Sequence, residues 1–249
     1  GSEMCIRDRG NIYIGGYVED ADIWSGQDII IQDGVNAGEN GRIEAMGNIS
    51  ARFFENAHII SHSDIKCDYM LNTTALAYGG IYLEGKRGSV IGGDVTGVRG
   101  ICIKACGSES YSKTVLRVGV TKEISSEYAK VLMVLKDIDT QIDRFNQALQ
   151  KLDILKKAGS DKFDETLNRK LLQSKIVKTA EKAKYEEKSR NLYTLVRESD
   201  RAVVRIDKNI YPGSRVFMGD KTYVPSTVFT HIALKKTSQG VLIRNYDSM

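Results

Sequence analysis

Proline, cysteine and long apolar runs are all scarce in this chain of 249 residues, and each scarcity excludes a class of protein. Two prolines beside 41% hydrophobic residues exclude a collagen-like or disordered chain. The longest uninterrupted apolar run is Val131–Leu135, far short of the ~20 residues that a membrane-spanning helix needs. Four cysteines do not make a disulfide framework at this length, so we expect reduced thiols in a cytoplasmic protein without membrane insertion.

A dense basic tract is also missing. The net charge is +4, and the balances over residues 1–120, 121–200 and 201–249 are −4, +3 and +5. None of these regions concentrates enough positive charge to neutralise many phosphates, so nucleic acid is not an expected partner.

Glycine is nearly absent from the middle of the chain. Residues 1–120 contain 19 of the 23 glycines, residues 121–200 contain one, and residues 201–249 contain three. This distribution predicts two kinds of architecture. Residues 1–9 show neither an apolar signal core nor the pattern that follows, and we interpret them as an assembly scar.

The glycine-rich part contains a short repeat. A small or polar start followed by a β-branched residue recurs at intervals of 14 to 20 residues, and these β-branched members are Ile12, Ile29, Ile49, Ile65, Ile81 and Val95. Each opens a run in which inward and outward side chains alternate, as in a β-strand. Because the starts recur in one direction without hairpin turn pairs, they predict the coils of a parallel β-solenoid. Uneven coil lengths do not keep hexapeptide register, which favours a right-handed β-helix.

The glycine-poor part predicts a helical hairpin. In the first helix, apolar positions alternate at spacings of four and three residues, which is the pattern of a coiled-coil seam. These seam positions are Ile124, Tyr128, Val131, Leu135, Ile138, Ile142, Phe145, Leu149 and Leu152. Gly159 and the later Asp164-Glu165 pair are typical of one helix ending and another beginning. The second helix, about 165–199, carries a looser seam at Leu167, Leu171, Ile176, Ala180, Ala183, Leu192 and Leu195.

The β pattern returns after the second helix. Val203–Ile206 reads as a strand, and the runs 227–234 and 241–243 predict a closing hairpin around Gln239-Gly240 that caps the last coil. We therefore expect four parts along the chain. They are the scar at 1–9, a β-helix at 10–120, an inserted coiled-coil hairpin at 121–200, and a return to the β-helix with a C-terminal cap at 201–249.

Four strings carry a resemblance to a known family. They are Gly47–Ala57, the glycine-bracketed basic turn Gly85–Gly93, the strand Thr114–Gly119, and the turn Tyr211–Gly213. Their types and order resemble the flagellar assembly protein A family, from Gly10 to about Met218. The resemblance implies a mainly β fold with an α insertion, in which a right-handed parallel β-helix is interrupted by a long antiparallel coiled-coil hairpin.

The resemblance also carries a functional expectation. It implies a non-enzymatic cytoplasmic protein linked to polar localisation and flagellar assembly in some bacteria. Family members usually carry an additional N-terminal domain, whereas this sequence opens inside a coil, so we expect a fragment. Related β-helices occur in polymer-forming bactofilins.

Sequence-local signs of catalysis, cofactor binding or metal binding are weak. Residues 80–86 fit the first seven positions of a P-loop, but Arg87 replaces the Mg-binding Ser/Thr and the intervening residues read as a strand. His58 and His62 lie roughly 13 Å apart along an extended strand, too far to share a metal. Cys102 and Cys106 fit small core residues. We therefore assign no catalytic, cofactor-binding or metal-binding residue.

Three functions follow from these observations, in order of preference. The first is a scaffold or adaptor whose hairpin binds protein partners, with Tyr185 and Tyr193 as candidate contacts unless they merely flank the seam. The second is a self-assembling, bactofilin-like cytoskeletal polymer, since bare parallel edges can template stacking. The third is an acyltransferase-type solenoid, which lacks the required hexapeptide register and an identifiable catalytic histidine.

Overall fold

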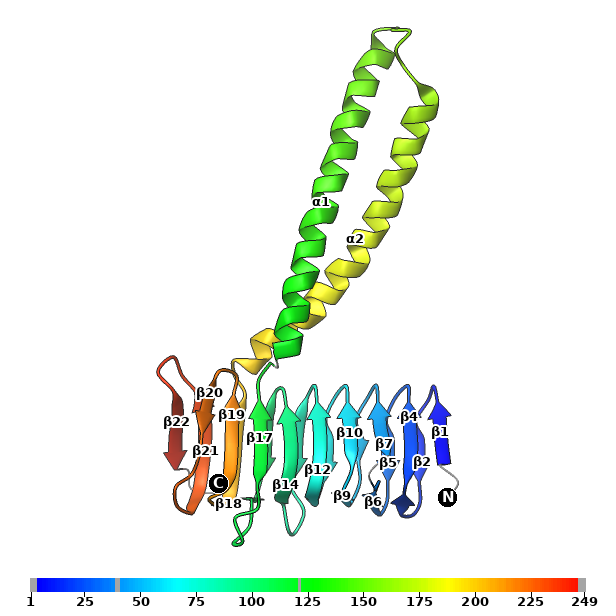
Figure 1. Cartoon of the computed structure of the whole chain (residues 1–249). Coiled ribbons are helices and arrows are strands. Elements are labelled where there is room, and N and C mark those ends of the chain that lie inside the picture. Colours follow the sequence, from blue (N-terminus) through cyan, green and yellow to red (C-terminus); the bar gives the residue numbers. More distant parts are fainter. Residues whose placement is uncertain (1–3, 39–40, 121, 246–249) are drawn as a thin grey trace. The chain divides into compact units, whose positions relative to one another are not determined.

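The computed structural model describes residues 4–38, 41–120 and 122–245, and it divides into two compact units (Figure 1). The first unit runs to residue 121 and resumes at Leu195, and the second is Lys122–Thr194. The first is a parallel β-solenoid of about six turns, as the repeat predicted.

Three columns of strands build the solenoid, and within each column neighbouring coils pair in parallel. The first column contains β1 (Met4–Asp8), β4 (Ala21–Ser25), β7 (Arg42–Ala45), β10 (His58–Ser61), β17 (Thr114–Val118) and β19 (Ser214–Met218). The second contains β2 (Ile12–Ile14), β5 (Ile29–Ile31), β8 (Ile49–Ser50), β11 (Ile65–Cys67), β13 (Gly80–Leu83), β15 (Gly100–Ile103) and β18 (Val203–Ile210). The third contains β3 (Val18–Glu19), β6 (Gly34–Asn36), β9 (Phe53–Glu55) and β16 (Ala105–Cys106). The long strands β12 (Tyr69–Ala77) and β14 (Ser89–Gly97) bend from the third column into the first.

An isoleucine ladder forms the centre of the core. The repeat starts Ile12, Ile29, Ile49, Ile65 and Ile81 stand in register in the second column, and all are buried. The ladder continues through Ile101 and Val204. Each side chain therefore packs on an equivalent one in the coils before and after it, which is why β-branched residues recur once per coil.

The sixth predicted start is wrong. Val95 belongs to β14 in the first column, where it pairs with Ala75 and Leu116, and Ile101 occupies the position expected for it. The reason is that β14 continues through a corner at Gly92 and Gly93, so the alternation before Val95 imitates the beginning of a new coil.

Polar residues before each isoleucine connect the coils. The backbone amide of Asp28 donates to Asn11 Oδ1 (3.0 Å), Asn48 N donates to Asp28 Oδ1 (2.6 Å), and Asp64 N donates to Asn48 Oδ1 (3.2 Å). Gly80 N then donates to Asp64 Oδ1 (2.7 Å). These side chains satisfy amides at a corner where strand pairing stops, and this explains the Asn/Asp at each repeat start.

A second corner uses left-handed backbone. The φ angles of Asp20, Asn56 and Asn72 are 42°, 46° and 47°, a region that Asn and Asp tolerate better than other non-glycine residues. Gly92 follows with φ 70°, and a Cβ at this position would collide with Asn72 Oδ1. Glycine therefore adopts in β14, without strain, the left-handed corner that Asn72 adopts at the equivalent position of β12.

The second unit interrupts the solenoid between neighbouring coils. β15 pairs with β18 and β17 pairs with β19, although α1 (Lys122–Lys157) and α2 (Glu165–Ser199) separate these strands in the sequence. The two helices form an antiparallel hairpin (Figure 1). Thr121, the first residue of the predicted hairpin, lies outside the described residues. Among the described residues, no helix is both long and apolar enough to cross a bilayer.

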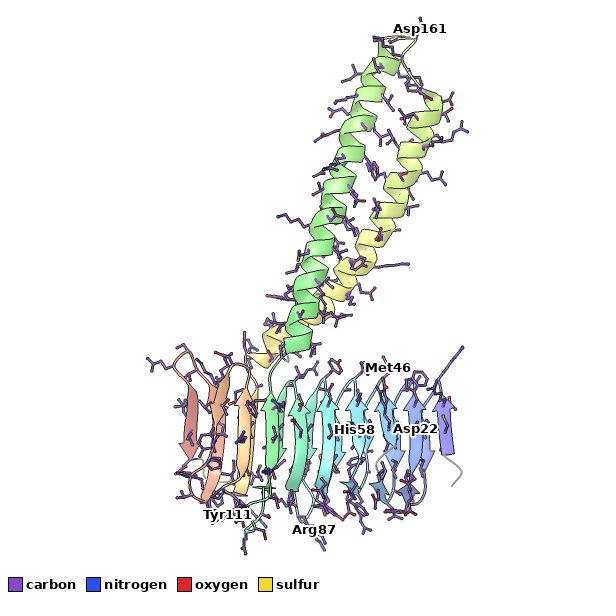
Figure 2. The ribbon with its side chains drawn as sticks, viewed as in Figure 1. Asp22, Met46, His58, Arg87, Tyr111 and Asp161 are labelled. Atoms are coloured by element: carbon purple, nitrogen blue, oxygen red, sulfur yellow. The ribbon has the colours of Figure 1, made fainter. Side chains whose placement is uncertain are left out.

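The connection between the helices follows the expected residues. Gly159 has φ 62° after the end of α1, and Asp164 Oδ1 accepts a hydrogen bond from Leu167 N (3.0 Å) as the N-cap of α2. Asp161 marks this connection in Figure 2.

The last strands change direction. β21 (Phe229–Lys236) pairs antiparallel with β18, β22 (Val241–Asn245) pairs antiparallel with β21, and β20 (Lys221–Tyr223) folds back on β19. The hairpin predicted around Gln239-Gly240 is thus β21–β22. These strands cover the free edges of the last parallel coil, where stacking of another coil would otherwise be possible.

An ion-pair cluster supports this closing region. Asp220 accepts from Lys236 Nζ at 2.7 Å, and Lys221 Nζ lies 3.3 Å from its other oxygen. The hydrogen bond from Lys236, followed by a backbone hydrogen bond and the bond from Lys221, lowers the pKa of Asp220 to about 2.

The beginning of the chain takes part in the solenoid. Met4–Asp8 form β1, whose five residues pair in register with Ala21–Ser25. The first three residues of the predicted scar lie outside the described part. Although residues 1–9 lack the repeat pattern, five of them extend the first column of strands.

Candidate interaction surface on the helical hairpin

The P-loop-like segment forms a strand and a turn. Residues 80–83 are β13, and β14 follows the turn where a P-loop would need a helix. The turn amides of Arg87 and Gly88 donate to Asp68 Oδ1 at 2.8 and 3.2 Å. A carboxylate of the chain itself therefore occupies the position where these amides would bind a phosphate.

The histidines do not converge on a common centre. His58, labelled in Figure 2, lies exposed on β10. His62 stacks on Tyr78, with ring centroids 4.9 Å apart. His62 Nε2 lies 3.6 Å from Glu44 Oε1. Among the described residues, no group of three or more His, Cys, Asp or Glu side chains is placed to hold a metal ion.

The cysteines inside the solenoid have the character of core residues. Burial raises the pKa of the Cys67 and Cys106 thiols, that of Cys106 to about 12, and both side chains are buried. Cys102 is half-buried, and burial raises its pKa as well. A reactive thiol requires a lowered pKa, so these environments oppose nucleophilic chemistry at these three positions.

A row of aromatic side chains on the solenoid surface makes its contacts with other residues of the same chain. Phe53 stacks on Tyr69 at 5.0 Å, and the Arg87 guanidinium lies 4.5 Å over the Tyr69 ring. Tyr69 donates its hydroxyl hydrogen bond to Glu55 at 2.8 Å. Because these groups already pair with one another across coils, their arrangement is explained by the stacking of the coils.

On the hairpin, α1 presents the expected row of apolar residues. Ile124, Val131, Ile138 and Leu152 are buried. The other members of the row are half-buried, namely Tyr128, Leu135, Ile142, Phe145 and Leu149. Each of the nine predicted seam positions is therefore turned at least partly away from solvent.

The matching row on α2 is largely polar. The least exposed positions of α2 are also spaced alternately by three and four residues, and three successive positions in this row are lysines. This row contains Asn168, Leu171, Lys175, Lys178, Lys182, Tyr185, Ser189, Leu192 and Val196. Long lysine side chains can cover apolar neighbours with their methylene groups while their ammonium groups stay in water.

Five residues predicted for the α2 seam lie outside this row, and one of them, Leu195, is half-buried. Leu167, Ile176, Ala180 and Ala183 are exposed. Hydrophobicity alone selected these positions, but the pairing of α2 with α1 selects a different row of the helix. The row has helical spacing in the sequence, but its lysines are not apolar, so hydrophobicity could not identify it.

Ion pairs and a ring contact hold the register between the helices. Lys182 Nζ lies 2.7 Å from Asp139 Oδ1, and Lys188 Nζ lies 2.7 Å from Glu127 Oε1. These hydrogen bonds raise the pKa of both lysines. The Lys182 side chain is 32% exposed and the other three are about half exposed, so water screens both pairs and each stabilises the hairpin only modestly. The register therefore depends mainly on the α1 seam.

The two candidate contact tyrosines differ in position. Tyr185 is half-buried and belongs to the α2 row described above, so only part of its ring is available to a partner. Tyr193 is 52% exposed and contacts Tyr128, with ring centroids 6.5 Å apart. A role of either residue in partner binding remains a prediction, and Tyr193 offers the larger free surface.

Several large apolar side chains on the hairpin face solvent. Leu132, Met133 and Ile154 of α1 are exposed. On α2 the exposed set is Leu167, Leu172, Ile176, Val177 and Tyr193. Nothing in the sequence distinguishes Leu172 or Val177, because their exposure depends on how the two helices pair.

Comparison with known proteins identifies one related family. The family described as the Flagellar Assembly Protein A beta solenoid domain matches residues 1–239 of the chain. Neither the curated proteins nor the solved structures compared with the chain provide a match.

Proposed function

Because the chain belongs to the Flagellar Assembly Protein A β-solenoid family, we propose that it is a non-enzymatic scaffold whose helical hairpin binds protein partners in the bacterial cytoplasm. The family name concerns assembly and not a reaction, so the proposed role is in flagellar assembly, with positioning at the cell pole as part of it.

The exposed apolar surface of the hairpin is the observation that carries this proposal. Leu172, Ile176 and Val177 of α2 are 45%, 68% and 60% exposed, within six consecutive residues. Exposed apolar side chains that lie together are characteristic of interaction sites. In the sequence the hairpin follows β17 and precedes β18. β17 pairs with β19 and β18 pairs with β15, so both connections of the hairpin come from paired strands of the solenoid.

Removal of the hairpin tests the proposal. Residues 122–194 form a separate compact unit, so replacing them with a flexible linker should leave the solenoid folded. In cells that depend on the protein, we expect the shortened chain to lose its polar position and to reduce the number of assembled flagella. Unchanged localisation and flagellation, with a folded solenoid, would contradict the proposed role.

A polymer of stacked solenoids is the second candidate. Within the described residues, β1, β2 and β3 each pair with a strand on one side only, which leaves parallel edges at one end. The antiparallel strands β20 and β21 close the other end, which favours the scaffold over the polymer. Light scattering across a hundredfold concentration range separates the two, because a polymer grows in mass with concentration whereas a scaffold keeps a fixed mass.

A further inference from the structure

The exposed side of α2 carries a second regular row, about half a turn from the row that faces α1. Nine exposed positions follow one another at spacings of three or four residues. They are Glu165, Arg169, Leu172, Ile176, Ala180, Ala183, Glu187, Arg190 and Thr194. Eight steps cover 29 residues, a mean step of 3.6 residues, which is the period of a straight α-helix. The nine residues therefore share one side of α2 over about 44 Å, and we name them the outer stripe.

Large and small side chains occupy different halves of the outer stripe. Leu172 and Ile176, which are 45% and 68% exposed, lie in its first half, and Ala180 and Ala183 follow in its second half. An antiparallel copy of the stripe reverses this order, so that each large side chain meets a small one. Small side chains let two helix axes approach to roughly 8 Å. The outer stripe is therefore complementary in shape to its own reverse.

The charges of the outer stripe follow the same rule. In chain order its charged residues are Glu165, Arg169, Glu187 and Arg190, so the signs run negative, positive, negative, positive. The reverse order has the opposite sign at every one of these positions. An antiparallel copy therefore brings opposite charges together, whereas a parallel copy would bring each charge to its identical counterpart, which is unfavourable.

These charged groups are available to a second copy. The side chains of Arg169 and Glu165 are 80% and 77% exposed, and they form an i,i+4 pair at 3.5 Å, a kind of pair that contributes little to stability. Within the described part of the chain, no opposite charge lies within 4.0 Å of Glu187 or Arg190. New ion pairs can therefore form without the loss of a strong contact inside the hairpin.

Complementarity of size and of charge occur in one register. The facing pairs, counted from one copy to the other, are Glu165 with Arg190, Arg169 with Glu187, Leu172 with Ala183, and Ile176 with Ala180. A two-fold axis then crosses α2 at the level of Val177 and Lys178. A shift of three or four residues in one direction places Arg169 against Arg190, and a shift in the other places Glu165 against Glu187. Like charges thus oppose the neighbouring registers.

From these observations we propose that the outer stripe of α2 is a dimerisation surface, which pairs antiparallel with the outer stripe of a second copy of the chain. The same surface serves both copies, as two-fold symmetry requires. Nine positions are fewer than the roughly 20–30 residues on each side of a standard interface, so the dimer dissociates on dilution. Val177, which is 60% exposed, lies outside the outer stripe and stays accessible to other protein partners.

This inference goes beyond the proposed function and does not depend on it, because the purified chain tests it without flagella. In analytical ultracentrifugation, the mass of the full chain should rise with concentration and level off at two copies. The double substitution Leu172→Asp and Ile176→Asp should leave a monomer, because it removes four apolar side chains from the dimer. Val177→Asp is the matched control and should still dimerise. Circular dichroism verifies that all variants keep their helices.

Three results of this measurement would overturn the proposal. They are a wild-type chain that stays monomeric at every concentration, a dimer that survives the double substitution, and a mass that grows beyond two copies equally in both chains. The last result would assign self-association to the edges of the solenoid.

Exchange of charges tests the antiparallel register. Arg169→Glu places glutamates face to face and Glu187→Arg places arginines face to face, so each variant alone should raise the dissociation constant of the dimer by roughly tenfold or more. An equimolar mixture of the two variants should dimerise again, because the two introduced charges face one another and the two native residues do so as well. Lys170→Glu changes the charge equally on another side of α2, and this control should dimerise like the wild type. A mixture that stays as weak as its components would refute the proposed pairing.

Discussion

Substitution of one buried residue in α1 measures how much the hairpin depends on its apolar seam. Ile138 is 2% exposed, and Lys182 of α2 bonds the adjacent residue, Asp139. Ile138→Lys removes a buried aliphatic side chain, which stabilises the fold by about 2–3 kcal/mol, and places a cation close to the lysines of the α2 row. We expect the hairpin to lose about 3 kcal/mol or more of stability.

The measurement is hydrogen–deuterium exchange resolved by segment. A loss of about 3 kcal/mol corresponds to roughly hundredfold faster exchange of the α1 and α2 amides, while the strands of the solenoid keep their protection. Met133→Lys is the control, because the same side chain is introduced at an exposed position of the same helix. Its effect should stay within about 0.5 kcal/mol.

Two results would refute this reasoning. Equal exchange in Ile138→Lys and Met133→Lys would show that the row of alternating apolar residues is not the pairing face of α1. A loss of protection in the solenoid as large as that in the hairpin would show that the two units do not unfold separately.

Three further predictions concern the solenoid. Gly93→Ala should destabilise the solenoid by about 1–3 kcal/mol, seen as a lower urea midpoint, because φ is 80° and a Cβ would collide with the backbone of the preceding coil. Gly240→Ala is the control and should change the midpoint little, because no atom lies within 4 Å of its Cβ; equal midpoints for the two variants would contradict the assigned backbone. Cys5 is exposed and should react with a thiol reagent at once, whereas Cys106 should react only on unfolding, because it is buried and burial raises its pKa to about 12. Equally rapid modification of both thiols would disprove the burial of Cys106. NMR should show Asp220 titrating near pH 2. The stability that its carboxylate contributes is therefore complete above its unfolded pKa near 3.8 and is lost as the pH falls toward 2, and a titration at 3.8 would show that its lysine contacts do not form in solution.

The solenoid was largely predictable because each coil repeats the same local requirements. Ile29, Ile49 and Ile65 occupy equivalent core positions, so the repeat in the sequence reports the repeat in space. Val95 misled this reasoning because β14 bends through a corner without interrupting its alternation. The ladder of Asn and Asp side chains was visible as a pattern, but its role in capping amides of the next coil emerged only from the hydrogen bonds.

The chain by itself determined that a glycine-rich solenoid alternates with a glycine-poor hairpin, and it determined the seam of α1, because in both cases apolar residues recur at the period of the local structure. Only the tertiary structure decided which side of α2 is paired. Lys175, Lys178 and Lys182 lie in the row toward α1, while Leu172 and Ile176 remain exposed. The physical reason is that hydrophobicity describes a single residue, whereas burial depends on register with a segment tens of residues away. The exposed apolar residues that this register leaves on α2 carry the proposed binding of a partner.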